Sequence, residues 1–293
     1  MQAEAWTPTL CGILHLSFQG PLGISPSMDL RIAFIGAGRM ARAMAGGIIQ
    51  KQTARPEHIC CTSADDGTGE ALANALGIRF SLDPAQLLEG ADVVILACKP
   101  QQLATIDPAL SDGCAGKLVI SILAGATRER LRTAFSKARN VVRTMPNTPG
   151  LIGAGVTVYA QNPDLNEGDE ATVRSILSAL GQVHAAEEKD LDAVTAVSGS
   201  GPAYVFEMVA ALRDAGIAEG LSPELAYPLA LQTVLGAAQL LQAVPETPET
   251  HREWVSSPGG TTLAGLAVMD QNNFRGLIKD TVTAAANRSR ELA

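Results

Sequence analysis

Residues 30–49 read LRIAFIGAGRMARAMAGGII. The run from Leu30 to Ile35 is short and apolar, and a glycine pair, Gly36 and Gly38, follows it at once. Beyond the glycines, apolar residues recur at helical spacing: Met40, Met44, Ile48 and Ile49. The stretch therefore predicts a buried strand, a tight turn and a helix in direct succession.

This pattern repeats along the first two thirds of the chain. Strands are expected at residues 58–62, 91–97, 117–122, 140–143, 155–160 and 182–185, with helices such as 69–76 and 167–180 between them. The runs ADVVILA and KLVISI are continuously apolar, which is typical of strands buried on both faces of a parallel sheet. We therefore predict an α/β domain over residues 28–187.

The composition changes after the acidic pair Glu187 and Glu188. Residues 188–293 are rich in helix formers, and they predict an all-α domain with helices at 191–197, 202–219, 223–243, 249–255, 262–269 and 274–292. The segment 225–241 is apolar nearly all the way round, so it needs burial on more than one face. We expect a subunit interface to provide that burial, and a self-contained helical bundle is the alternative.

Charge and cysteine content exclude several classes of protein. The net charge of -8 is spread along the chain without a long basic run, which argues against nucleic-acid and anionic-membrane partners. No apolar stretch reaches the roughly 20 residues that cross a bilayer. The five cysteines form no CxxC pair, so no metal site is predicted, and reduced thiols favour a cytoplasmic location. The first 27 residues lack the basic segment of a signal peptide and are expected to be a disordered extension, with Met28 as an alternative start.

The glycine-rich turn after the first strand is the predicted nucleotide site. Gly36 and Gly38 begin a GxGxxG pattern in which Ala41 takes the third position, which the pattern tolerates. Gly36 would make the tight turn and Gly38 would let a pyrophosphate approach the backbone, facing the free N–H groups of residues 38–40. A plain turn is the alternative, but its place at the head of a strand–helix–strand series favours a dinucleotide.

The end of the second predicted strand indicates which dinucleotide is bound. An acidic residue there would hold the ribose hydroxyls of NAD, whereas this strand ends in Thr62-Ser63-Ala64. Two hydroxyls without a carboxylate favour NADP. Asp65 and Asp66 lie close by and no arginine follows, so NADH stays open; Arg39 would supply the missing positive charge or would simply be solvated.

Three clusters of glycine, proline and hydroxyl residues remain, at residues 145–149, 198–202 and 256–262. In the last, the N–H groups of Gly259, Gly260 and Thr261 would form an anion-binding nest before a helix, with the Thr262 hydroxyl beside it. A small carboxylate fits such a nest. The alternative is that the serines and threonines are only helix caps and the glycines only turns.

At these residues the chain resembles the pyrroline-5-carboxylate reductase family. The similarity runs from about Arg31 to Leu292 and includes FIGAGRMA, ADVVILACKPQ, VVRTMPNTP, DAVTAVSGSGPAYVF, QTVLGAAQLL, VSSPGGTTLAGL and AAANRSREL. The resemblance implies a Rossmann domain followed by a helical C-terminal domain that interlocks two subunits, in dimers or assemblies of dimers. It also implies NAD(P)H-dependent reduction of 1-pyrroline-5-carboxylate to L-proline, the last step of proline biosynthesis.

The resemblance also assigns site residues by position. The implied cofactor contacts are Gly36, Ala37, Gly38, Arg39, Met40, Thr62, Ser63, Ala97, Cys98, Lys99, Pro100, Ile122, Leu123 and Ala124. The implied substrate contacts are Glu188, Ser256, Ser257, Gly259, Gly260, Thr261 and Thr262, of which Thr262 is the catalytic candidate because its hydroxyl is expected to meet the ring nitrogen. Two positions depart from the family pattern: Pro84 stands where an Asn side chain often contacts the cofactor, and Trp254 replaces a smaller polar residue.

The imine reduction implied by the resemblance requires few acid or base side chains from the protein. A protonated cyclic imine already carries a positive charge beside the carbon that accepts hydride, so positioning and charge are enough. A β-hydroxyacid dehydrogenase is the enzymatic rival, but it needs a lysine on the first interdomain helix, and SGSGPAYVFEMV has none. A non-catalytic NADP(H)-binding regulator, or a structural protein that has kept the fold, is the rival from another class, and the intact 256–262 segment argues against it.

Overall fold

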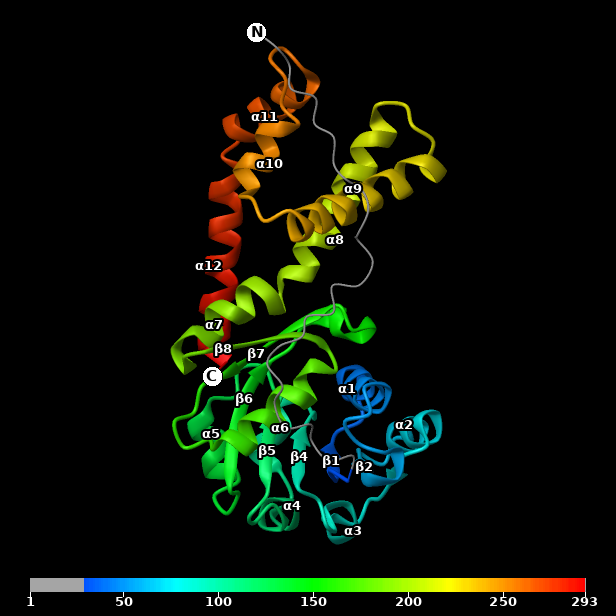
Figure 1. Ribbon diagram of the computed structural model, residues 1–293, viewed down its shortest axis with the longest axis vertical. Coiled ribbons are helices and arrows are strands. Elements are labelled where there is room, and N and C mark those ends of the chain that lie inside the picture. The colour runs from blue at the N-terminus through cyan, green and yellow to red at the C-terminus, as the bar shows by residue number, and fades with distance from the viewer. Residues whose placement is uncertain (1–28, 293) are drawn as a thin grey trace.

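The computed structural model describes residues 29–292, so the extension expected at residues 1–27 lies outside the described part of the chain. These residues form two regions (Figure 1). The first contains the sheet and its covering helices, and the second is an elongated helical arm that leaves the sheet and returns to it. The predicted order, an α/β domain followed by an all-α domain, is confirmed.

Within residues 29–292 the sheet has eight strands in the order β3-β2-β1-β4-β5-β6-β7-β8. Neighbouring strands are parallel except for the antiparallel pair β6 and β7. The strands are β1 (Ile32–Ile35), β2 (Ile59–Thr62), β3 (Arg79–Phe80), β4 (Val93–Leu96), β5 (Leu118–Ser121), β6 (Asn140–Met145), β7 (Gly155–Ala160) and β8 (Gly181–Ala186). The first six follow the strand order of a Rossmann fold, whose ligand crevice lies at the carboxyl ends of the strands beside β1.

Two apolar clusters, one on each face of the sheet, hold the helices in place. Phe34 of β1 belongs to the cluster that includes Met44 and Ile48, while Ile35 belongs to the cluster that includes Leu131. The helices are α1 (Arg39–Gln50), α2 (Thr68–Leu76), α3 (Pro84–Leu88), α4 (Pro108–Gly113), α5 (Arg128–Ala134) and α6 (Glu167–Ser178), with short turns η1 (Pro56–His58), η2 (Pro100–Thr105) and η3 (Thr148–Ile152). Alternate residues of β1 thus pack on opposite faces of the sheet, which lies between two layers of helices.

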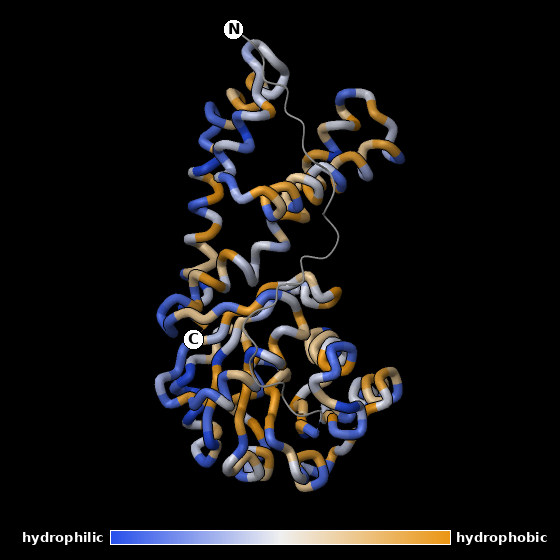
Figure 2. The backbone as a smooth tube through the Cα atoms, viewed as in Figure 1, coloured by the Kyte–Doolittle hydropathy of each residue, from blue (hydrophilic) through white to orange (hydrophobic). Residues whose placement is uncertain are grey.

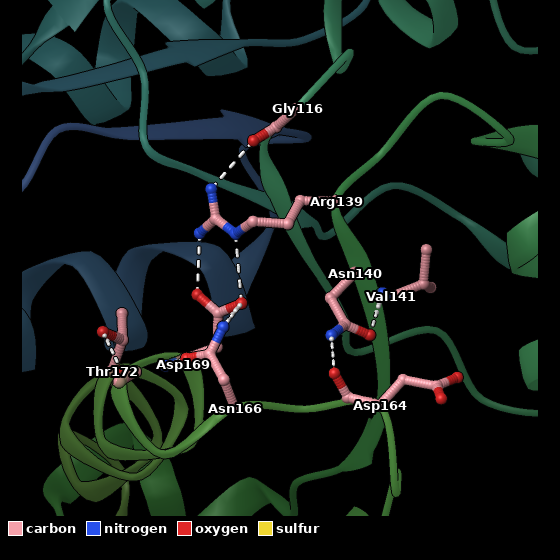
Figure 3. Close-up of polar contacts among 9 residues, drawn as sticks. Gly116, Arg139, Asn140, Val141, Asp164, Asn166, Asp169 and Thr172 are labelled. Atoms are coloured by element: carbon pink, nitrogen blue, oxygen red, sulfur yellow. Dashed lines mark hydrogen bonds and ion pairs between the residues drawn. The ribbon is translucent and has the colours of Figure 1, made fainter.

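A set of polar contacts, here called the polar clamp, fixes α6 to the N-terminal ends of the parallel strands (Figure 3). Arg139 Nε and Nη2 donate to the two carboxylate oxygens of Asp169 at 3.0 and 2.7 Å, and Arg139 Nη1 donates to the Gly116 carbonyl at 2.8 Å. Asn166 caps α6 by accepting from the Asp169 N–H at 2.8 Å. Because the clamp lies where β6 starts, it anchors the fold away from the strand ends at which a nucleotide binds.

The helical arm follows η4 (Glu188–Asp190) and α7 (Leu191–Val194). It contains α8 (Gly201–Ala218), α9 (Pro223–Ala243), α10 (Pro248–Trp254), α11 (Thr261–Gln271) and α12 (Phe274–Leu292). The single helix expected at 191–197 is instead α7 joined to a π-helical turn, η5 (Thr195–Gly199), where the Ser200 N–H donates to the Thr195 carbonyl at 2.8 Å. The wide turn is a frequent feature of functional segments, and the helical period of the sequence does not reveal it.

Apolar residues are spread along the arm instead of being confined to one side (Figure 2). Large side chains of α8 and α9 stay exposed, among them Phe206 at 66%, Leu225 at 48% and Leu235 at 47%. A single chain therefore does not bury these helices as a self-contained bundle. No helix within residues 29–292 has the length and apolar character needed to span a membrane.

Candidate active site

A cavity of about 570 Å³ opens at the carboxyl ends of β1, β2 and β4. This is the crevice beside β1 where open α/β sheets bind nucleotides. Among the residues that line it are eight of those expected to contact a cofactor: Gly36, Ala37, Gly38, Thr62, Ser63, Ala97, Cys98 and Lys99. The structure thus brings together residues that are up to 63 positions apart in the sequence, counting from Gly36 to Lys99 (99 − 36).

The two glycines of the turn have different local geometries. Gly36 has φ +113°, and a Cβ there would lie 2.5 Å from the carbonyl carbon and oxygen of Ala97, so only glycine fits. Gly38 has φ −72° and no atom within 4 Å of its Cβ position. A side chain at Gly38 would therefore project into open space next to the start of α1, which has no side-chain cap within the described residues. These features fit a pyrophosphate at this helix end.

Three charged residues line the cavity: Asp66 after β2, Lys99 after β4 and Asp107 before α4. The Thr68 hydroxyl and N–H donate to Asp66 Oδ1 at 2.6 and 3.0 Å, and these bonds, with a smaller effect of Lys99, lower the pKa of Asp66. Ser63 Oγ accepts from the Gly69 N–H at 3.0 Å. Asp107 accepts from the Ala109 N–H at 2.8 Å, so the cavity is lined by two carboxylates and one ammonium group.

Other predicted cofactor residues do not line this cavity. Arg39 faces a different hollow beside Gly150 and Ile152, and Met40 packs against an apolar cluster of the core. Pro100 begins η2, and residues 122–124 follow β5, where the Ile122 N–H donates to the Leu96 carbonyl at 3.1 Å. Among residues 29–292, Lys99 rather than Arg39 is therefore the basic residue that lines the cavity.

The departure at Pro84 has a structural explanation. Pro84 is the first residue of α3, a position for which its fixed φ is suited, and it lines the cavity. Asp83 caps the helix by accepting from the Ala85 N–H at 2.9 Å. The position therefore offers an apolar ring to a ligand instead of a hydrogen-bonding amide. Burial raises the pKa of the neighbouring Cys98 thiol, which keeps this group neutral as well.

The 256–262 segment links α10 to α11. Gly259 has φ +72°, and the Gly260 N–H donates to the Ser257 carbonyl at 2.9 Å. The N-cap of α11 is Gly260, without a side-chain cap, and Ser256 Oγ donates to the Arg252 carbonyl at 2.6 Å. The serines and threonines therefore do not cap α11, and the Thr262 hydroxyl has no hydrogen-bond partner within residues 29–292. The helix-cap alternative thus does not hold for α11, whereas Gly259 and Gly260 do form a turn.

The structure does not bring this segment to the cavity within one chain. The segment joins α10 and α11 at the end of the arm remote from the sheet (Figure 1). Glu188 lies elsewhere again, in a hollow of about 690 Å³ beside Arg143 and Asp192. Its Oε1 accepts from Arg143 Nη1 at 2.9 Å and from the Arg128 N–H at 3.1 Å, whereas the buried Oε2 has no partner among the described residues. The predicted substrate residues are thus divided between two places.

Sequence reasoning missed the partners of Glu188. Arg143 is 5% exposed and belongs to a strand with valines on both sides of the sheet, so its charge had to be paired. The sequence signal that could have revealed this pair is a charged residue, Arg143, inside the run NVVRTM. The other two glycine–proline clusters meet in the fold, because a Cβ on Gly199 would lie 2.5 Å from Met145 Cε.

Comparisons with known proteins place the chain in a family. Residues 188–292 match the family described as pyrroline-5-carboxylate reductase dimerisation, and residues 31–125 match NADP oxidoreductase coenzyme F420-dependent. A pyrroline-5-carboxylate reductase of Synechocystis sp. is 41% identical, covering 90% of this chain and 99% of the relative.

Two solved structures show the same relationship. A pyrroline-5-carboxylate reductase from Coxiella burnetii has a TM-score of 0.84 at 36% identity, covering 90% of this chain and 99% of that one. A Plasmodium falciparum pyrroline carboxylate reductase with NADP bound has a TM-score of 0.79 at 30% identity, covering 90% and 98%. Fold, sequence motifs and near full-length identity agree, and the chain belongs to the pyrroline-5-carboxylate reductase family.

Proposed function

We propose that this chain reduces the C=N bond of 1-pyrroline-5-carboxylate to give L-proline, the last step of proline biosynthesis, with NADPH as the preferred hydride donor and NADH as the second. The observation that carries the proposal is the β1 crevice. Its left-handed Gly36 turn, its open Gly38 position and its uncapped α1 fit a dinucleotide. Family membership supplies the reaction class.

The residues of the chain bind and orient the reactants. The bound dinucleotide supplies the hydride, and the crevice and residues 122–124 hold it. The N–H groups of Gly259, Gly260 and Thr261 at the start of α11 hold the substrate carboxylate. The free hydroxyl of Thr262 orients the ring nitrogen, so the imine carbon faces the donor. Glu188 stays a proposed substrate contact.

The proposal requires self-association, in a dimer or an assembly of dimers. Exposed apolar side chains on α8 and α9 support a subunit interface, as does the match of residues 188–292 to a dimerisation family. Because the 256–262 segment is remote from the cavity of its own chain, a partner subunit must supply it. We accordingly propose that residues 28–187 bind the cofactor and that residues 188–293 bind substrate and the second subunit.

A cytoplasmic location is also proposed. Cys60, Cys61, Cys98 and Cys114 are free thiols in the described part of the chain, which supports a reducing compartment. Burial raises the pKa of Cys61 and Cys114 to about 12, so these thiols are inert at physiological pH.

One assay separates the proposed function from its rivals. The purified protein, mixed with NADPH and pyrroline-5-carboxylate, is expected to consume reduced nicotinamide, followed by its absorbance, with formation of proline. A hydroxyacid dehydrogenase would act on a β-hydroxyacid with the oxidised cofactor, but α8 has no lysine to serve it. A regulator would bind NADPH and turn over neither substrate. NADPH binding without proline formation would contradict the proposal.

We expect Lys99 to determine the preference for NADPH over NADH. Lys99→Gln is expected to raise the Kd of NADPH about tenfold and to leave the Kd of NADH nearly unchanged, because a charge-assisted contact to the 2'-phosphate is lost. The matched control is Arg39→Gln, which removes a cation that faces another hollow. Both Kd values are measured by nicotinamide fluorescence. Equal weakening of NADPH and NADH by Lys99→Gln would contradict the assignment.

A further inference from the structure

A buried ion cluster joins the sheet to the connector that leads into the arm. Arg143 of β6 is 5% exposed, and its guanidinium donates to Glu188 Oε1 at 2.9 Å and to Asp192 Oδ1 at 3.5 Å. One arginine thus meets carboxylates from η4 and α7. Because an unpaired charge at this depth would be costly, the cluster fixes the connector on the end of β6.

The last helix of the chain joins the same cluster. Ser289 of α12 is 5% exposed, and its Oγ donates to Asp192 Oδ1 at 2.7 Å. Ala286, one turn earlier, is 6% exposed, so the face of α12 that carries both residues packs on the connector. We call Arg143, Glu188, Asp192 and Ser289 the Arg143 cluster.

The end of α12 also borders the segment that follows β5. A Cβ on Gly125, which has φ +73°, would lie 3.2 Å from the Leu292 carbonyl oxygen and 3.3 Å from Leu292 Cβ. Arg130 Nη1 donates to that carbonyl at 3.5 Å. Leu292 is three residues beyond Ser289 and so lies on the same face of the helix. Residues 122–124, the proposed cofactor contacts, come immediately before Gly125.

We infer that the Arg143 cluster holds the end of α12 against residues 122–125 and thereby positions the segment that contacts the nicotinamide half of the cofactor. In a Rossmann crevice the adenosine half lies toward β2, which leaves the reactive half on the β4–β5 side. This inference rests on the proposed cofactor site. Arg143, Asp192 and Ser289 are positioning residues and touch neither reactant.

Two variants release α12 from different contacts. Ser289→Ala removes the hydroxyl that bonds to Asp192, and deletion of residues 292–293 removes the contact with Gly125. Ser289→Thr, which keeps a hydroxyl, is the rescue variant. Thr172→Ala is the control for loss of a helix hydroxyl elsewhere, since it removes a bond to the Gly168 carbonyl at 2.9 Å on α6. Each protein is measured for NADPH Kd, for kcat and KM of the imine, for melting temperature and for assembly mass.

The expected result is a rise in NADPH Kd of about fivefold in both release variants, with lower kcat, little change in the KM of the imine and an unchanged assembly mass. Ser289→Thr and Thr172→Ala are expected to match the unmodified protein in Kd. A lower melting temperature with unchanged NADPH Kd would overturn the inference, because the cluster would then serve stability alone. Loss of the assembly in the release variants would also overturn it.

The experiment separates this inference from the proposed function. If the unmodified protein binds NADPH but forms no proline, the proposed reaction fails, and the NADPH Kd values still decide whether the cluster positions the cofactor segment. If proline forms normally and the release variants bind NADPH as the unmodified protein does, only the inference fails.

Discussion

Thr262→Ala is expected to lower kcat about a hundredfold, because a misplaced imine loses the alignment on which hydride transfer depends. The Thr262 side chain caps no helix and has no hydrogen-bond partner within residues 29–292. Its removal therefore leaves no buried group unpaired, and the chain should fold and assemble normally. Steady-state kinetics with the imine, together with NADPH fluorescence titration, check the result: NADPH Kd should stay nearly constant.

Two matched variants make the Thr262 result specific. Thr262→Ser keeps the hydroxyl and should retain most of the turnover. Thr261→Ala removes a hydroxyl from the adjacent residue while keeping the backbone N–H that the nest uses, so it should have a small effect. If Thr262→Ala turned over the imine as fast as the unmodified protein does, the threonine would have no role in the mechanism.

Gly36→Ala is expected to abolish NADPH binding and to lower the free energy of unfolding by on the order of 3 kcal/mol. The added Cβ would meet the Ala97 carbonyl group at 2.5 Å in a backbone conformation of φ +113° that alanine resists. Relief of that contact would displace the segments that follow β1 and β4, both of which line the cavity.

Glycine controls distinguish the possible causes. Gly77→Ala also places a Cβ at positive φ, +67°, but in open space at the end of α2, so it should lose only about 1 kcal/mol and bind NADPH normally. Gly38→Ala should fold normally and weaken NADPH binding, because its Cβ occupies the pyrophosphate position. Denaturant unfolding and NADPH fluorescence measure both properties. Normal NADPH binding by Gly36→Ala would contradict the proposed site.

Sequence periodicity predicts most of the fold because buried strands and amphipathic helices have distinct patterns. The strands β1, β2, β4 to β8 and the six longest helices begin or end within a few residues of their predicted positions. The two-residue strand β3 was missed, since Arg79 is exposed and only pairing with β2 defines it. The π-helical turn η5 was missed because its hydrogen-bond pattern leaves no period in the sequence.

The candidate site is less accessible to sequence reasoning. Motif position placed Gly36 and Lys99 in one group, and the cavity brings these two residues together. The same reasoning grouped Glu188 with Thr262, but no spacing in a sequence reports that α11, which contains Thr262, lies away from the sheet. Nor does spacing identify Arg143, Asp192 and Ser289 as neighbours, because the first and the last are 146 positions apart in the sequence (289 − 143). The roles of all these residues stay predictions.

The return of α12 to the sheet has a consequence for biosynthesis. Residues 122–125 leave the ribosome long before Leu292, yet Leu292 borders them in the folded chain. Domains generally fold as they are synthesised, starting from the N-terminus. The segment that follows β5 in a nascent polypeptide therefore folds before its contact with α12 can form.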